Sequence, residues 1–351
     1  MVPVPVAAAR SRGAALVLDL LRTAGEPGIS RLELAERTGL TPQAVSKITA
    51  RLRTEGLATE AGHRASTGGK PRTVLRLVPS AGYAVGVHLD RDELTTLLAD
   101  LAGALVALRR RPLDLGEGAG PVLDAVTEEV RALLGGPPEA RAVLGVGVAM
   151  PGPLDHRAGV PGRVTGFPEW EGHPVREELA GRLGLPVVLD KDTNAAALGL
   201  AIRPAAPGSF AYVHLGTGLG AGLVLGGAPL RGDRTGAGEL GHQTVQLDGP
   251  PCGCGGRGCL EVLCLAAVGR GELPEAARIL GAGAANVVRL LDIDQVLLGG
   301  RVVLAAPGVF ADGVREVLAG LGLTAPVGVA AEPDAVAEGA AWLILGPIFG
   351  K

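Results

Sequence analysis

Residues 30–56, SRLELAERTGLTPQAVSKITARLRTEG, decide the fold of the amino-terminal part of the chain. Ser30 and Glu33 have the spacing of a capping box, in which each side chain satisfies a free amide at the start of a helix. Thr41 and Pro42 predict the start of a second helix, because a threonine cap before a first-turn proline is a favoured combination. A glycine turn separates the two helices. The pattern predicts a helix-turn-helix, whose second helix lies in the major groove of DNA.

The second predicted helix has one apolar face and one polar face. Val45, Ile48 and Leu52 recur at helical spacing and are expected to point inward. The intervening polar residues then point outward, where amide and hydroxyl groups near the helix start reach base edges and cations reach phosphates. We expect DNA contacts from this face and from the basic turn that follows it: Thr41, Gln43, Ser46, Lys47, Arg51, Lys70 and Arg72.

The flanking sequence adds a helix and a wing. Residues 10–24 are apolar on one face and end at a glycine, which predicts a helix. Residues 57–60 and 73–78 have the composition of two strands, and the turn between them, STGGKPR at 66–72, is glycine-rich and basic. Together these features predict a winged helix-turn-helix domain over residues 1–79. The alternative is a generic three-helix unit with a solvated basic hairpin.

Charge is unevenly distributed along the 351 residues. Residues 1–80 carry 12 Lys/Arg against 6 Asp/Glu, whereas the whole chain has a net charge of −3, so the remainder is acidic. This asymmetry favours a nucleic-acid-binding module attached to a larger domain, with chance variation in surface charge as the alternative. Two Trp, two Tyr and four Phe are too few for binding single-stranded nucleic acid by base stacking.

From about residue 83, short apolar segments alternate with helical stretches, which predicts an α/β fold with layered sheets. Residues 204–230 carry no Asp, Glu, Lys or Arg, but their regularly spaced glycines predict strands and a turn rather than a membrane span. We expect strands at 84–89, 95–101, 142–150, 187–190 and 210–215, and helices at 122–134 and 176–183.

No membrane segment is expected. The first ten residues lack a basic region followed by an apolar run, so no secretory signal is expected either. Four Cys, three of them within eight residues, do not fit a secreted disulfide scaffold. We therefore expect a reduced, cytoplasmic protein.

The three clustered cysteines predict a metal site. Cys252, Cys254 and Cys259 lie on a Gly/Pro-rich loop, with His242 ten residues upstream. Three thiolates and one imidazole are a usual ligand set for a closed structural zinc site, which implies one Zn²⁺ per chain. A buried thiol pair is the alternative, but the flanking glycines and arginine are not typical of a core. Cys264 is expected to be a small apolar core residue.

Four segments resemble, in their order, the motifs of the ROK family: DKDTNAAALG at 190–199, LGTGLGAG at 215–222, GELGH at 238–242 and CGCGGRGCLE at 252–261. That family comprises sugar kinases and sugar-responsive repressors. The resemblance implies an actin-like ATPase fold of two lobes over residues 80–351, and with the winged head it is to repressors of the xylose- and N-acetylglucosamine-regulator type. Lobe one is expected at about 80–200 plus a C-terminal helix at about 335–351, and lobe two, with the zinc site, at about 201–334.

The resemblance also implies a sugar site. Zinc is expected at the four residues named above, and sugar contacts are expected from Asp192, Glu239, His242 and Glu261. Asp192 matches the general base of the family's kinases. Lys191 stands where the family has asparagine, so it either pairs with Asp192 and fills the pocket or attracts an acidic ligand. The segment after Cys259, which in most relatives is tens of residues longer and supplies helices beside the sugar, is short here.

The kinases of the family begin this domain with an Asp-x-Gly-Gly-Thr phosphate loop, where this chain has HLDRD at 88–92. Two carboxylates there would oppose a triphosphate, so we expect no enzyme activity and a vestigial Asp192. The expected function is sequence-specific DNA-binding transcriptional repression in response to a sugar, by a homodimer or a dimer of dimers on a double-stranded operator. The alternatives are a ROK sugar kinase with an added DNA-binding domain, and a repressor whose sensor answers to a protein or to nothing.

Overall fold

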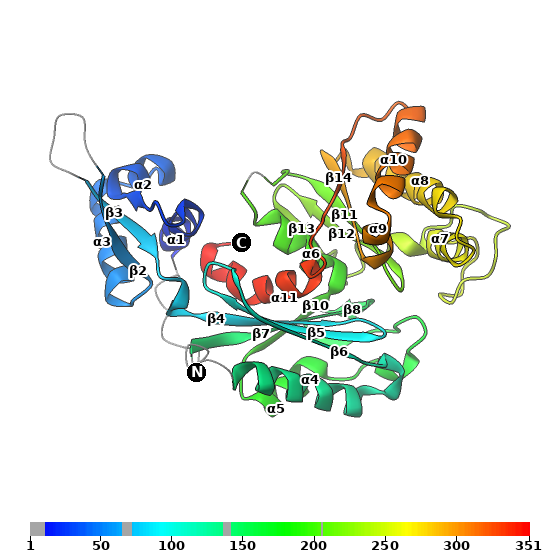
Figure 1. Cartoon of the computed structure of the whole chain (residues 1–351), viewed down its shortest axis with the longest axis horizontal. Coiled ribbons are helices and arrows are strands. Elements are labelled where there is room, and N and C mark those ends of the chain that lie inside the picture. The colour runs from blue at the N-terminus through cyan, green and yellow to red at the C-terminus, as the bar shows by residue number, and fades with distance from the viewer. Residues whose placement is uncertain (1–10, 65–71, 136–141, 205) are drawn as a thin grey trace.

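The computed structural model describes residues 11–64, 72–135, 142–204 and 206–351. Its amino-terminal part is a winged helix-turn-helix, as predicted (Figure 1). A three-stranded sheet in the order β1-β3-β2 packs beside three helices. The elements are α1 (Arg12–Ala24), β1 (Ile29–Ser30), α2 (Arg31–Thr38), α3 (Pro42–Thr54), β2 (Ala58–Arg64) and β3 (Arg72–Leu77).

The predicted helix caps of this head are formed. The backbone N–H of Glu33 donates to Ser30 Oγ at 3.3 Å, and Glu33 Oε2 accepts from the Ser30 N–H at 2.8 Å, so the capping box is complete. Thr41 Oγ1 accepts from the N–H of Ala44 at 3.3 Å. Two details differ from expectation. The first wing strand, β2, is longer than predicted, and β1, which pairs with β3, was not predicted because two residues carry no periodicity.

The first of two larger sheets has the strand order β10-β7-β4-β5-β6. Strands β10, β7 and β4 run parallel, and β5 and β6 continue the sheet antiparallel. Helices α4 and α5 cover one face (Figure 1). We call this unit lobe one. Its elements are β4 (Tyr83–Leu89), β5 (Glu93–Asp100), β6 (Leu105–Pro112), α4 (Ala119–Leu134), β7 (Val143–Met150), α5 (Val175–Leu183) and β10 (Val187–Lys191), with a small hairpin of β8 (Leu154–Asp155) and β9 (Val160–Pro161).

The second large sheet has the order β13-β12-β11-β14-β15 and forms lobe two with the helices on its outer side. The uncharged stretch 204–230 contributes three of its strands, as the glycine spacing indicated. Within the described ranges, no helix has the length and apolar character needed to cross a bilayer. The elements are β11 (Phe210–Leu215), β12 (Leu219–Leu225), β13 (Ala228–Leu230), α7 (Leu260–Gly269), α8 (Leu273–Leu291), β14 (Gln295–Gly299), α9 (Arg301–Ala305), α10 (Pro307–Gly320) and β15 (Val327–Val329).

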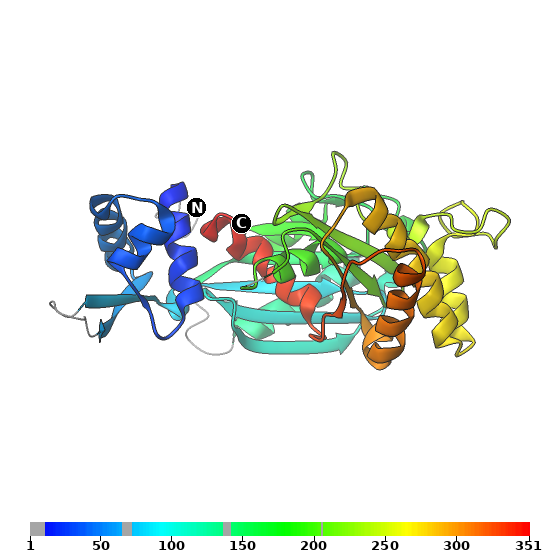
Figure 2. The same cartoon turned by 90° about the horizontal axis from the view of Figure 1, so that it is seen from above.

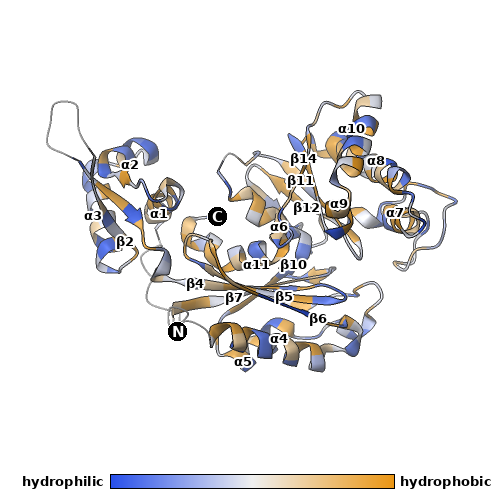
Figure 3. Cartoon of the chain, in the orientation of Figure 1, coloured by the Kyte–Doolittle hydropathy of each residue, from blue (hydrophilic) through white to orange (hydrophobic). Residues whose placement is uncertain are grey.

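Two helices, α6 (Asp192–Ala201) and α11 (Ala335–Leu345), lie between the two sheets (Figures 1 and 2). They pack backbone to backbone, because a Cβ on Gly339 would stand only 1.8 Å from the carbonyl oxygen of Ala195. Figure 3 shows apolar residues concentrated along the central strands and on these helices. The C-terminal helix expected at 335–351 ends at Leu345, and a 3-10 turn, η7 (Gly346–Phe349), follows it because Pro347 lacks the N–H that would continue the helix.

Candidate effector pocket, metal cluster and DNA-contacting surface

Helix α3 presents the polar face that its sequence predicted. Val45 and Leu52 are buried and Ile48 is half-buried, which leaves the opposite side in solvent. All five predicted contact residues of this segment are exposed: Thr41, Gln43, Ser46, Lys47 and Arg51. Arg51 Nε lies 2.9 Å from Glu55 Oε1, so part of its charge is compensated. Arg72 is exposed on β3, whereas Lys70 lies outside the described residues.

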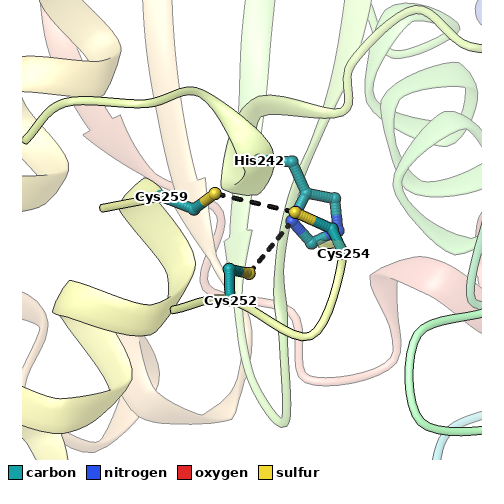
Figure 4. Close-up of side chains that lie close together, drawn as sticks. All are labelled: His242, Cys252, Cys254 and Cys259. Atoms are coloured by element: carbon teal, nitrogen blue, oxygen red, sulfur yellow. Dashed lines mark hydrogen bonds between the residues drawn. The ribbon is translucent and has the colours of Figure 1, made fainter. Parts of the chain in front are cut away.

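The four predicted metal ligands converge on one point (Figure 4). One ligand atom from each of His242, Cys252, Cys254 and Cys259 lies within 4.8 Å of the other three. The Cys254 and Cys259 sulfurs are 3.7 Å apart, and Cys252 Sγ is 3.8 Å from His242 Nδ1. Ligands at 2.3 Å from a tetrahedral ion have edges of about 3.8 Å, so the donor set and its spacing fit a zinc ion. The N–H of Gly256 points at Cys254 Sγ at 3.4 Å.

The four predicted sugar-contacting residues line one pocket between the lobes. Asp192 opens α6, Glu239 caps the start of the 3-10 turn η6 (Leu240–His242), His242 ends that turn, and Glu261 lies in the first turn of α7. Glu261 Oε2 accepts from the N–H of Leu219 at 2.8 Å. The structure therefore brings together residues that lie 69 positions apart at the extremes.

Lys191 is buried in the same pocket, with 2% of its side chain exposed. Its Nζ donates to Glu239 Oε1 at 2.8 Å and to the carbonyl oxygen of Ala237 at 2.6 Å. The first alternative raised by the sequence, an ion pair between Lys191 and Asp192, is therefore wrong. The lysine fills part of the pocket, but its carboxylate partner is Glu239, which η6 brings over the end of β10.

Asp192 is the titratable group with the most unusual environment in the pocket. Burial, with a smaller contribution from the nearby carboxylate of Asp90, raises its pKa from 3.8 to about 7, against the hydrogen bond that it accepts from the Thr193 N–H. The charge of Lys191 offsets only part of this effect. A carboxyl group that titrates near neutrality has the proton affinity that a general base needs.

Acidic residues of the segment 88–92 contact two glycine turns of lobe two. The hydroxyl of Thr217, in the turn Gly216–Thr217–Gly218, donates to Asp90 Oδ1 at 2.7 Å. Arg301, directly after Gly299 and Gly300, pairs with Asp92 at 2.8 Å. The sequence singled out Asp90 and Asp92, but it did not predict their partners, which are 127 and 209 positions away.

Other pocket residues were also missed from sequence. Arg91 lines the pocket, with its guanidinium carbon 5.8 Å from the ring centroid of Phe167. His214, on β11, has its pKa lowered to about 4 by burial, so it is neutral. These residues belong to or adjoin the motif segments at 88–92 and 215–222, and that proximity was the only signal in the sequence.

Comparisons with known proteins agree with this architecture. Residues 85–271 match the model of the ROK family, and residues 17–59 match a model described as winged helix-turn-helix DNA-binding. The chain is 31% identical, over 66% of its length, to a putative xylose repressor of Caldicellulosiruptor sp. (strain Rt8B.4). The matched region spans 59% of that relative, which is less than two thirds of it.

Two solved structures share the fold. A ROK family transcriptional regulator described as a homolog of the Escherichia coli MLC protein superposes with a TM-score of 0.78, at 23% identity, over 96% of each chain. A ROK family glucokinase from Streptomyces griseus, solved with glucose and AMPPNP, superposes with a TM-score of 0.65, at 25% identity, over 75% of this chain and 99% of that one.

The chain thus has a two-lobed body of the sugar-kinase fold that carries a winged helix-turn-helix head. The chain belongs to the ROK family, whose model covers more than half of it.

Proposed function

We propose that this protein is a sequence-specific DNA-binding transcriptional repressor whose activity responds to a carbohydrate bound between the lobes. The observation that carries the proposal is the exposed polar face of α3, with Gln43 and Ser46 near its start and Lys47 behind them, on a helix whose opposite face is buried. Amides and hydroxyls in this position suit base edges, and the lysine suits phosphates. The match to a putative xylose repressor supports the same function.

The test is direct selection of an operator. Wild-type protein is incubated with a random-sequence duplex library, and the enriched duplexes are sequenced and titrated by fluorescence anisotropy. We expect a near-palindromic sequence bound more tightly than random duplex, because two heads of a symmetric dimer read two half-sites. A protein that enriches no sequence and binds duplex independently of salt is not a repressor of this kind. The expected species is a homodimer or a dimer of dimers in the cytoplasm.

We further propose that His242, Cys252, Cys254 and Cys259 hold one structural Zn²⁺ per chain. Bound zinc would cross-link η6 to the loop that leads into α7, and the proposal rests on the donor set and the sulfur spacing given above. Glu239 directly precedes η6, and Glu261 lies in the first turn of α7, two residues after Cys259. The metal cluster therefore positions two of the pocket's four proposed sugar contacts, and His242 belongs to both groups.

The effector we propose is a sugar or sugar derivative. Carboxylates and an imidazole from three elements face one pocket, and such acceptors match the hydroxyl groups of a carbohydrate. Asp192, Glu239, His242 and Glu261 are the proposed contacts. Because Glu239 already accepts a hydrogen bond from Lys191, a sugar hydroxyl has to bind Glu239 together with Lys191 or break that ion pair.

A ROK sugar kinase is the second candidate, and one observation favours it. The pKa of Asp192 lies near 7, as a general base for hydroxyl attack requires. Two contacts weigh against it. Asp90 accepts a hydrogen bond from the Thr217 hydroxyl, and Asp92 pairs with Arg301. Both carboxylates belong to the segment that corresponds by resemblance to the kinases' phosphate loop, where phosphoryl transfer needs amides and cations. We therefore favour the repressor.

A further inference from the structure

Arg22, on the head helix α1, has a nearly buried guanidinium, with 9% of its side chain exposed. Asp19, one turn earlier, accepts from Nε and Nη2 at 3.1 and 2.7 Å. The same guanidinium also contacts the body of the protein. Its Nη2 donates to the carbonyl oxygen of Ile202 at 3.3 Å. Its central carbon lies 5.1 Å from the centroid of the Trp342 ring and 5.4 Å from that of the Phe349 ring. Arg22 therefore makes hydrogen bonds and cation–π contacts to the body of the protein.

The body contacts of Arg22 come from the ends of both helices that lie between the sheets. Ile202 is the C-cap of α6, and Trp342 lies in the last turn of α11, just before η7. Helix α6 starts at Asp192 in the effector pocket, so its ten residues span about 15 Å between the pocket and Arg22. One helix thus has a proposed ligand contact at one end and the DNA-binding head at the other.

The two helices are packed tightly against different lobes. On α6, the carbonyl oxygen of Thr193 approaches β12 of lobe two so closely that a Cβ on Gly222 would lie 2.0 Å from it. On α11, the carbonyl oxygen of Ala337 stands in the same relation to Gly86 on β4 of lobe one, also at 2.0 Å. Because α6 and α11 also pack against each other at Gly339, a relative movement of the lobes has to be taken up by a shift between these two helices, and Arg22 contacts the ends of both.

The head and the C-terminus are joined by further contacts around Arg22. Lys351 Nζ lies 3.2 Å from Asp19 Oδ2, and a Cβ on Gly350 would meet Ala15 at 3.4 Å. Buried residues of the head and of α11 and η7 form one continuous apolar cluster. Both views show α1 beside the chain's C-terminus (Figures 1 and 2). The head is docked on the body, not merely tethered by the chain after β3.

We propose that Arg22 is the positioning residue through which the state of the effector pocket sets the position of the DNA-binding head, an inference that rests on the proposed function for its physiological meaning. The hydrogen bond to Ile202 is already 3.3 Å long, so a shift of about 1 Å at the end of α6 takes it out of range while the aromatic contacts hold Arg22 to α11. The planar guanidinium is needed for these two kinds of contact, since an ammonium group cannot stack on aromatic rings and donate hydrogen bonds in a fixed plane at the same time.

The first experiment needs neither sugar nor DNA. Lys191→Met removes the ion pair that ties the start of α6 to Glu239 in lobe two, and hydrogen exchange by mass spectrometry then measures the protection of α1. We expect Lys191→Met alone to change the amide hydrogen-exchange rate of α1 at least threefold. In a chain that also carries Arg22→Lys or Arg22→Ala, the same substitution should have less than a third of that effect. Arg22→Lys keeps the charge and supports folding.

Arg12→Ala is the matched control. Arg12 lies exposed on the same helix, near the C-terminal residues Phe349 and Lys351, and has no charged partner among the described residues. Its loss removes an equal charge and leaves the contacts of Arg22 to Ile202 and Trp342 in place. The double variant Arg12→Ala/Lys191→Met should respond as fully as Lys191→Met alone. An unchanged α1 in Lys191→Met, or an equal response with and without Arg22, overturns the proposal.

The second experiment joins the inference to the proposed function. Operator affinity is measured with and without D-xylose, D-glucose and N-acetyl-D-glucosamine at 10 mM. We expect any sugar that raises the melting temperature to change operator affinity at least fivefold in wild type and in Arg12→Ala, and less than twofold in Arg22→Lys. A wild type that binds no duplex refutes the repressor function alone, because the exchange experiment still decides the role of Arg22.

Discussion

Lys191 Nζ lies 2.8 Å from Glu239 Oε1, and this ion pair joins the last residue of β10 to the turn η6 of the opposite lobe. Only 2% of the lysine side chain is exposed, against 34% of the glutamate. The cost of losing either partner is therefore unequal, because only the lysine is left in a place that water does not reach.

Glu239→Ala should destabilise the protein more than Lys191→Met does. Removing the carboxylate leaves a buried ammonium with only the Ala237 carbonyl, whereas methionine fills the same volume without a charge. We expect a difference of about 1–2 kcal/mol in the free energy of unfolding, below the value for a fully buried pair because Glu239 is one-third exposed. Urea unfolding of the two single variants and of Lys191→Met/Glu239→Gln measures it. Equal losses in the single variants would contradict the asymmetry.

Lys47→Ala should weaken binding to every duplex and lower the slope of log affinity against log salt by about 1, as expected for one phosphate contact. Arg51→Ala should have a smaller effect, because Arg51 is already paired with Glu55. Gln43→Ala should instead reduce discrimination between operator and random duplex. Anisotropy titrations at several salt concentrations separate the three outcomes. A salt slope that is the same in Lys47→Ala and wild type would remove Lys47 from the interface.

Purified protein should contain about one zinc per chain, as a closed four-ligand site requires. Cys254→Ser and Cys259→Ser should lower the zinc content and the melting temperature, because metal binding is coupled to local folding. Cys264→Ser is the matched control, since Cys264 is buried in the core with its sulfur 3.6 Å from the Ala276 carbonyl, away from the cluster. Elemental analysis by mass spectrometry decides. Full zinc in Cys252→Ser/Cys254→Ser would show that the ligands are misassigned.

No ATP-dependent phosphorylation of glucose, N-acetylglucosamine, mannose, fructose or xylose is expected above background. Asp90 accepts a hydrogen bond from Thr217, and Asp92 forms an ion pair with Arg301. The negative charges of the two aspartates oppose the binding of a triphosphate. The assay is ADP release, run beside Asp192→Asn. Turnover that disappears in this variant would make the protein a kinase with a regulatory head.

The stability gained by Asp192→Asn should depend on pH. The folded-state pKa of Asp192, about 7, lies above the ordinary 3.8, so its contribution to stability is fully present below about pH 4 and is lost as the pH rises through 7. Asparagine does not titrate. The free energy of unfolding of Asp192→Asn minus that of wild type should therefore rise between about pH 4 and 7 and level off above. Parallel stability curves would show that the carboxyl is not desolvated.

Much of the architecture follows from local sequence. The capping box of Ser30 and Glu33, the cap at Thr41 and the two-residue glycine spacing from Gly216 predicted their helices and strands, because caps and periodicity act between neighbours in the chain. The close spacing of the three cysteines likewise predicted the metal cluster. Strand β6 was missed, since its residues are exposed or half-buried and carry no apolar alternation. It exists because β5 offers it a partner.

Only the tertiary structure decided which charged groups meet. The sequence placed Lys191 beside Asp192, yet η6 brings Glu239, 48 positions away, to the ammonium group. Asp90 finds Thr217 at a separation of 127, and Arg22 finds Ile202 at a separation of 180. Short-range patterns reflect hydrogen bonding and burial within one element. The partner of a polar side chain depends instead on how distant elements pack, so the contents of the pocket and the docking of the head became visible only in the folded chain.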